Sequence, residues 1–493
     1  MLRVLILIAG LLMLSPLGAR AETTLRMAHD LGFGAKTTMD PYDPNRFWPT
    51  IDMVFDGLAD FDPKGLPRPR LATEWSSSAD LKTWTFKLRP GVKFHDGSDF
   101  DATDVIYSFK RMIDPEFDSP IRAVLGIIAD IKAIDPLTVE FSLSTAEADF
   151  PLLTADYRAM ITPEGSKDTI NVTPIGTGPF KVETLSAEGT TVLAVNPDYF
   201  RGRPGVGKIE MIAIPDSAAR VQALLAGQID LLQYLDPKQS ALFDNNPEFV
   251  LQRIPSGDWN ALAVQTNVKP FDDVRIRKAL RLAADREDLI KLVLGEGNCV
   301  VACDTPVWSG DPYRWEGSCP QDIEGAKKLL AEAGYPDGID VEIFTSDVEE
   351  GMVPIVEVYQ AQAKEAGIRV KLTMTAADGF WDNVWMKKPF FVDSWGQRPA
   401  TQVLNEVYRS GAPWNPTVWT RPDFDALLDK ARAEPDFATR KTLYGEAQKM
   451  LFEEGGNFIP YHRVLLRVVR SNIKGIESPV VIDNFDWSKI SIE

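Results

Sequence analysis

Residues 71–112 read LATEWSSSADLKTWTFKLRPGVKFHDGSDFDATDVIYSFKRM and contain the clearest local structural signals in the chain. From Thr83 to Arg89, apolar residues alternate with polar ones, which predicts a half-buried strand. Pro90 and Gly91 then predict a turn, and residues 92–94 resume the alternation as a second strand. We therefore expect a β-hairpin at this point of the fold.

The same run continues into a predicted helix. Asp101 can accept a hydrogen bond at the N-terminus of that helix, and Asp104 stands where a capping box needs its second acidic residue. The pair His95-Asp96, which precedes the helix, could suggest a catalytic base with its orienting acid. Because Asp96 belongs to an Asp-Gly turn, we interpret the pair as the end of the hairpin and not as an active site. The apolar face of the helix consists of Val105, Ile106, Phe109, Met112 and Ile113.

Beyond this region the pattern changes near residue 270, from a strand-rich first half to alternating helices and strands. A strand at 341–344, a helix near 353–365 and a strand at 368–374 predict a β-α-β unit, the building block of a parallel sheet. A chain of 493 residues is too long for one core. We expect an α/β protein of two lobes, with the chain crossing between them near Lys269 and near Leu465.

The first 21 residues have the features of a secretory signal peptide. A basic start precedes an apolar run from Val4 to Leu17, and small residues at Ala19 and Ala21 predict cleavage after Ala21. No cysteine lies near that point, so a lipid anchor is not expected. No later run is apolar for the roughly 18–20 residues of a membrane helix, and we expect a soluble, exported protein.

Composition excludes one class of partner. The formal net charge is −18 at pH 7 and the chain has no basic run, so we expect no nucleic-acid binding. The three cysteines, Cys299, Cys303 and Cys319, lie close together. In an oxidising compartment we expect two of them to form a disulfide, and the sequence leaves open which two. A metal site is the alternative, but the three histidines lie elsewhere in the sequence.

Catalytic signatures are scarce. Neither H-E-x-x-H nor G-x-S-x-G occurs, and GRPGVGKI at residues 202–209 lacks the Ser or Thr that a phosphate-binding loop needs. We expect a binding protein that has no cofactor and no metal. A cluster of tryptophans supports ligand binding, because large rings in loops commonly line a cleft for an organic molecule. The cluster contains Trp381, Trp385, Trp395, Trp414 and Trp419.

Arg398 lies within this cluster, three residues after Trp395. An arginine beside aromatic rings can bind both oxygens of a carboxylate or phosphate in a low-dielectric cleft. The alternatives are an ion pair with Asp393 or a solvated charge in a loop. For Trp395 we favour a position in the cleft, whereas for the tryptophans as a group a position in the core is equally favoured.

With these residues identified, the chain resembles the extracytoplasmic solute-binding proteins of the peptide, nickel and opine class of ABC importers, family 5. Residues 71–112 are similar to the signature block of that family. Later landmarks follow in the family order: GTGPFKVE at 176–183, NPDYFRGRPGVGKIEM at 196–211, FDDVRIRKALRLAADREDLI at 271–290 and AKKLLAEAGYPDG at 326–338.

The resemblance implies a periplasmic binding protein fold of class II, cluster C type. Lobe 1 would span residues 22–270, with an extra subdomain inserted at about 60–170, and lobe 2 residues 271–465; residues 466–493 would return to lobe 1. In peptide-binding members, an acidic residue shortly after a Trp-Gly pair holds the α-ammonium group of the ligand. Arg398 stands at that place, which argues against a plain peptide with a free amino terminus.

From the resemblance we expect a monomeric periplasmic protein that binds a peptide, an opine or a related amino-acid conjugate and delivers it to a permease of the inner membrane. The rival functions are a secreted hydrolase of peptides or conjugates, and a nickel-chelate or haem binder of the same family. Backbone groups would carry much of any peptide recognition. The candidate ligand-binding side chains are Trp395, Arg398, Trp259, Trp308 and Asp30.

Overall fold

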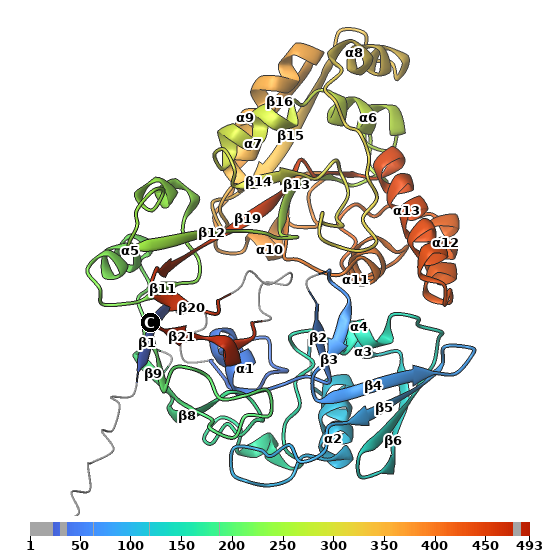
Figure 1. The fold of residues 1–493 in the computed structure, drawn as a ribbon. Helices are drawn as coiled ribbons and strands as arrows, with labels where there is room; N and C mark the ends of the chain where they lie inside the picture. Colours follow the sequence, from blue (N-terminus) through green and yellow to red (C-terminus); the bar gives the residue numbers. More distant parts are fainter. Residues whose placement is uncertain (1–22, 30–36, 63, 118, 187, 477–484) are drawn as a thin grey trace, which may run out of the picture.

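A computed structural model describes residues 23–493, except for 30–36, 63, 118, 187 and 477–484. The predicted signal peptide, residues 1–21, and the candidate ligand-binding residue Asp30 therefore lie outside the described residues. Three large sheets organise the described part of the chain. In Figure 1 the five-stranded sheet, with its helices, occupies the upper part of the molecule, and most of the eight-stranded and four-stranded sheets lies below it. The predicted two-lobed α/β architecture is confirmed.

The first sheet has eight strands in the order β12-β19-β11-β1-β10-β9-β8, with β14 paired to β19. Strand β1 is parallel to both β10 and β11. The strands are β1 (Thr24–His29), β8 (Phe180–Thr184), β9 (Thr190–Val195), β10 (Lys208–Ala213), β11 (Leu231–Leu232), β12 (Phe249–Pro255), β14 (Cys299–Val301) and β19 (Tyr461–Arg470).

The second sheet has five strands in the order β16-β15-β17-β13-β18. Strands β15 and β16 are parallel and helix α9 connects them, so the predicted β-α-β unit is confirmed. The strands are β13 (Trp259–Val264), β15 (Ile339–Thr345), β16 (Ile368–Met374), β17 (Phe390–Trp395) and β18 (Asn457–Phe458).

The third sheet, β4-β5-β7-β6, contains the first strand of the sequence signature. In β5, Trp84, Phe86 and Leu88 are buried, as their alternation predicted. The predicted hairpin partner is wrong, because residues 92–94 form only a single bridge, between Lys93 and Asp99. Both edges of β5 are occupied by β4 and β7, so no edge remains for that segment. The strands are β4 (Ala72–Ser77), β5 (Thr83–Leu88), β6 (Ile128–Asp135) and β7 (Thr138–Leu143).

Helices pack around these sheets, and among the described residues none is long and apolar enough to cross a membrane. They are α1 (Trp48–Val54), α2 (Ala102–Ile113), α3 (Arg122–Leu125), α4 (Phe150–Leu153), α5 (Ser217–Leu225), α6 (Val274–Leu282), α7 (Arg286–Val293), α8 (Ile323–Glu332), α9 (Met352–Ala363), α10 (Phe380–Asn383), α11 (Ala400–Val403), α12 (Pro422–Arg432) and α13 (Phe437–Glu454). Two short pairs complete the fold, β2 (Ala59–Phe61) with β3 (Pro67–Pro69) and β20 (Ile473–Lys474) with β21 (Ser491–Ile492).

Apart from the short strand β14, which pairs with the start of β19, the chain moves between the first and second sheets at two places that lie side by side. It leaves β12 at Pro255 and enters β13 at Trp259, and it returns through β18 and β19. The first change of sheet comes earlier in the sequence than the lobe boundary predicted at residue 270; the lobe boundaries themselves stay a prediction. The two connections contact each other, since the Arg463 amide donates to the Asp258 carbonyl at 2.7 Å.

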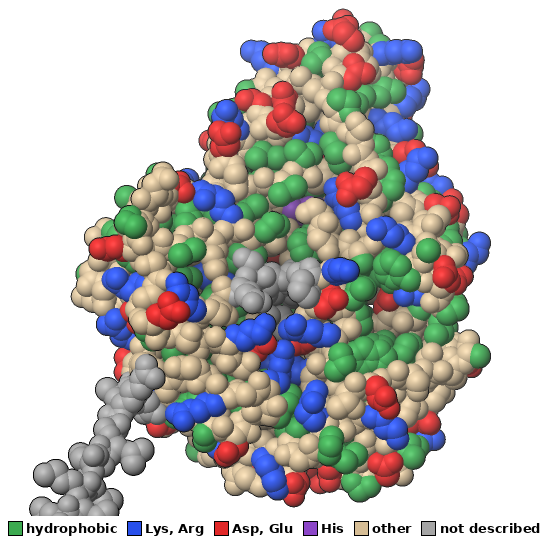
Figure 2. Space-filling view, viewed as in Figure 1, with side chains coloured by type: hydrophobic (Ala, Val, Ile, Leu, Met, Phe, Trp, Pro, Cys, Tyr) green, Lys and Arg blue, Asp and Glu red, His purple; other side chains and the backbone are tan. Residues whose placement is uncertain are grey.

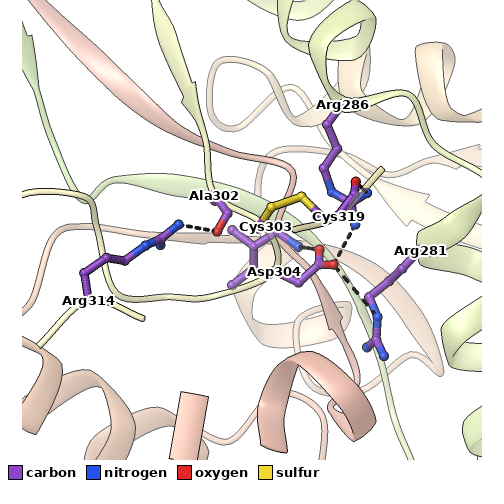
Figure 3. Close-up of a disulfide and its surroundings, with 8 residues drawn as sticks. Arg281, Arg286, Ala302, Cys303, Asp304, Arg314 and Cys319 are labelled. Carbon is purple, nitrogen blue, oxygen red and sulfur yellow. Dashed lines mark hydrogen bonds and ion pairs between the residues drawn. A yellow bond between two sulfur atoms is a disulfide. The ribbon is translucent and has the colours of Figure 1, made fainter. Parts of the chain in front are cut away.

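The disulfide joins Cys303 to Cys319 and leaves Cys299 as a free thiol (Figure 3). Next to it, the buried carboxylate of Asp304 accepts a hydrogen bond of 2.6 Å from Arg286. The sequence predicted a disulfide among these cysteines, and the fold identifies the pair. Among the described residues, no group of three or more His, Cys, Asp or Glu could hold a metal ion.

Candidate functional site

A cavity of about 310 Å³ lies where β2, the segment 152–158, the loop after β17 and the two sheet connections meet. We call it the interlobe cavity. Its volume is at the lower end of the 300–1,000 Å³ that is typical of small-molecule sites. The lining residues are Phe61, Leu152, Leu153, Asp156, Tyr157, Arg158, Tyr234, Asp258, Gly396, Gln397, Arg398, Pro399, Gln402 and Leu465. Figure 2 shows acidic and basic side chains interspersed over most of the visible face.

The loop after β17 is tied to the link between β12 and β13 by two hydrogen bonds. The Gln397 amide donates to Asp258 Oδ1 at 2.7 Å, and Gln397 Oε1 accepts from the Gly257 amide at 2.8 Å. A side chain at position 257 would lie 2.7 Å from Gln397 Cγ and 3.2 Å from the Trp308 ring. Glycine at 257 therefore allows the two segments to approach closely.

Arg398 lines the cavity but is not free. Its Nε donates to Glu406 Oε2 at 3.0 Å and one terminal nitrogen donates to the Gly396 carbonyl at 3.0 Å. The guanidinium also lies 4.9 Å from the centre of the Trp395 ring, in a cation–π contact. The second terminal nitrogen has no hydrogen-bond partner among the described residues, and the side chain is 20% exposed, so Arg398 can still donate to a ligand.

Asp393, the alternative partner considered for Arg398, has a different role. It is fully buried and accepts the indole N–H groups of Trp385, at 2.7 Å, and Trp395, at 2.8 Å. Burial raises the pKa of Asp393 to about 7, although the two indole donors act in the opposite direction. The alternative that Arg398 forms an ion pair with Asp393 is therefore wrong, and Arg398 pairs with Glu406 instead.

The predicted tryptophans form a wall behind this loop. Trp395 is 9% exposed and Trp259 is 1% exposed, and their rings stack with centroids 6.2 Å apart. Trp308, 6% exposed, packs against Gly257. None of the three is among the lining residues of the interlobe cavity, whereas the residues directly after Trp395 are.

On the opposite side, the inserted subdomain contributes an ion pair. Arg158 donates to Asp156 through Nε at 2.8 Å and a terminal nitrogen at 2.6 Å, and both side chains are almost completely buried. This bidentate arrangement is the strong form of a carboxylate–guanidinium contact. Sequence reasoning did not select these residues, because a charged pair two residues apart is usually a surface feature.

Asp258 is a charged lining residue of the cavity that the sequence analysis did not select. It directly precedes Trp259, which was selected for its ring, and it lines the cavity. Burial raises the pKa of Asp258, against the lowering effects of the Gln397 amide and of Arg463. The sequence offered one signal, a carboxylate directly before a predicted strand. Its contact with Gln397 could not be predicted, because the two residues are 139 positions apart in the sequence.

A second set of contacts joins the inserted subdomain to the other half of the molecule. Glu147 pairs with Arg432 at 2.8 Å, and Asp149 accepts from the Tyr313 hydroxyl at 2.8 Å and lies 3.3 Å from Arg440. We call these five residues the interlobe clasp. Burial raises the pKa of Glu147 to about 7 despite the guanidinium of Arg432, and burial raises that of Asp149 as well.

The comparisons with known proteins identify a family. The chain matches the model of bacterial extracellular solute-binding proteins, family 5 Middle, over residues 67–414. It is 28% identical to Di/tripeptide-binding protein 2 of Pseudomonas aeruginosa, and the alignment covers 91% of this chain and 92% of that protein.

Two solved structures have the same fold over nearly the full length. The ABC transporter-associated periplasmic binding protein DppA from Helicobacter pylori, in complex with the peptide STSA, has a TM-score of 0.77 and 25% identity; the match covers 96% of this chain and 99% of that one. AgaA from A. tumefaciens R10, in complex with agropinic acid, has a TM-score of 0.78 and 25% identity, with 95% and 99% covered.

Proposed function

This chain belongs to the bacterial extracellular solute-binding proteins of family 5, and from that premise we propose that it captures a small amino-acid-derived ligand and delivers it to an ABC permease. The observation that carries the proposal is the interlobe cavity, to which both halves of the molecule contribute polar side chains. A cavity of about 310 Å³ suits a peptide of a few residues or an opine. The names of the relatives, which include peptide and agropinic acid binders, agree with this class.

The mechanism follows from two halves joined by two adjacent connections. A ligand that contacts both halves binds the closed form more tightly than the open form, and so shifts the population towards closure. The permease then binds the closed, ligand-loaded form in preference to the open, empty form. No covalent step is needed. We place the predicted lobes at residues 22–270 and 271–465, with export directed by residues 1–21 and delivery in the periplasm.

We further propose that Arg398 binds a carboxylate of the ligand. Its remaining N–H donor and its position over Trp395 support this role, although Glu406 already offsets one charge. Trp395, Trp259 and Trp308 form the rigid backing that holds the loop, and Asp30, which lies outside the described residues, stays a predicted ligand-binding residue. Isothermal titration calorimetry of Arg398→Ala tests the proposal with the co-purified ligand. An affinity equal to that of the natural protein removes Arg398 from the site.

The ligand class is tested by purification of the protein from its own compartment, followed by native mass spectrometry and identification of the released molecule. A peptide, opine or amino-acid conjugate agrees with the proposal. A haem or nickel chelate supports the rival function of a nickel-chelate or haem binder. Incubation with a peptide library tests the hydrolase, because an enzyme converts its substrate whereas a binding protein returns its ligand intact.

A further inference from the structure

One of the charged residues that line the interlobe cavity has no ion-pair partner among the described residues. Asp156 is paired with Arg158, and Arg398 with Glu406. Asp258 is the remaining charged residue of the lining, and it forms no ion pair within 4.0 Å among the described residues. Asp258 is half-buried, and a partly desolvated carboxylate without an ion-pair partner favours a cationic group beside it.

The backbone and one oxygen of Asp258 are fixed in place before any ligand arrives. Its amide donates to Ser256 Oγ at 3.1 Å, and its carbonyl accepts from the Arg463 amide at 2.7 Å. Its Oδ1 accepts from the Gln397 amide at 2.7 Å. No described residue donates to Oδ2. The residue is therefore rigidly held with one carboxylate oxygen available at the cavity, which is the arrangement that a preorganised acceptor needs.

The charged groups nearest to Asp258 do not take over this role. Arg463 donates to Asn260 Oδ1 at 2.6 Å and to the Glu350 carbonyl, so its guanidinium is directed to other acceptors. Arg398 pairs with Glu406 through Nε and forms no ion pair with Asp258 within 4.0 Å. Glu349, which bonds to Ser394, adds a further negative charge to the surroundings of Asp258.

We propose that Asp258 binds a protonated amine of the ligand, and this inference rests on the proposed function of the cavity. The ligand would then carry an amine for Asp258 and a carboxylate for Arg398, which defines a zwitterionic amino-acid derivative. The sequence argued against a free amino terminus because Arg398 replaces the expected acid. Asp258 supplies an acid from the link between β12 and β13, so that objection no longer applies.

A mixed library of dipeptides, prepared with free and with N-acetylated amino termini, is the probe. The acetyl group removes the positive charge and leaves the rest of the molecule unchanged. Native mass spectrometry selects the tightest pair, and calorimetry measures both members on the natural protein. We expect the free amine to bind about 10- to 100-fold more tightly, which is the range for one charge-assisted hydrogen bond.

Asp258→Asn provides the second arm of the experiment. It keeps the shape of the side chain and the hydrogen bond from the Gln397 amide but removes the charge. We expect this variant to lose most of the preference for the free amine. Asp378→Asn, at an exposed position, is the matched control and should keep the preference. Thermal unfolding without ligand checks that Asp258→Asn is folded, and the acetylation test on the natural protein does not depend on any variant.

The outcomes separate the two proposals. Equal binding of free and acetylated dipeptides, or an unchanged preference in a folded Asp258→Asn variant, overturns the role of Asp258 and leaves the binding function intact. If the protein retains neither form of any dipeptide, the peptide class of the proposed function fails, and the role of Asp258 fails with it.

Discussion

His462 is a buried imidazole whose protonation the fold prevents. It lies in β19, 1% exposed, and burial lowers its pKa to about 3, an effect to which the nearby Arg314 adds. In the unfolded chain its pKa is ordinary, near 6.5. Below about pH 6.5 the unfolded state binds a proton at His462 and the folded state does not. The free energy of unfolding therefore decreases as the pH falls.

We therefore expect His462 to cost about 2 kcal/mol of stability between pH 7.5 and pH 5. Urea unfolding of the natural protein and of His462→Gln at both pH values measures it. The difference between the two proteins isolates this residue from the carboxyl groups that titrate in the same range. If both proteins lose equal stability on acidification, His462 is not the cause.

Gly257 illustrates a second constraint at the scale of one residue. A methyl group at this position would lie 2.7 Å from Gln397 Cγ, so Gly257→Ala must push the Gln397 loop away from Asp258. We expect a loss of about 1–3 kcal/mol in stability and weaker ligand binding. Gly396→Ala is the control for stability, since its methyl group meets only Asp258 Oδ1, at 3.9 Å. Equal unfolding free energies for the two variants would contradict this interpretation.

Among the elements, α2 is the one most completely specified by its own sequence. Asp101 accepts from the Thr103 amide at 2.7 Å, and Asp104 bonds back to the Asp101 amide at 3.0 Å, which forms the predicted capping box. Asp101→Ala should lower the free energy of unfolding by about 1 kcal/mol. Lys110→Ala, on the exposed face of the same helix, should have little effect. A loss in Asp101→Ala no larger than in this control would show that the cap is not stabilising.

The contrast between α2 and residues 92–94 shows how far sequence reasoning reaches. A helix cap depends on residues three positions apart, so the sequence predicted it. The hairpin needed a free edge of β5. Strand β4 occupies one edge, and β7, which follows some fifty residues later, occupies the other. The site divides in the same way. Arg398 was predicted because the tryptophan near it in the sequence indicated a binding loop. Asp258 and Gln397, in contrast, come together only because β13 pairs with β17.

At the scale of the whole molecule, the interlobe clasp should bias the equilibrium between open and closed forms. In the structure Glu147 is buried beside Arg432 with a pKa of about 7, and in a more open form that separates the pair its pKa would return towards the ordinary value near 4.3. The closed form therefore binds the proton more readily. By linkage, closure should become more favourable as the pH falls through 7, and less favourable as it rises.

Two substitutions in the clasp should act in opposite directions at pH 8. Glu147→Gln imitates the protonated acid and removes the cost of burying its charge, so we expect more of the compact form without ligand. Arg432→Gln leaves Glu147 buried without its partner, which is the costly case for a broken ion pair, and we expect a more open molecule. Small-angle scattering measures the radius of gyration of each variant at pH 6 and pH 8. The pH dependence should be smaller in Glu147→Gln; a change of the same sign in both variants would mean that the clasp does not control closure.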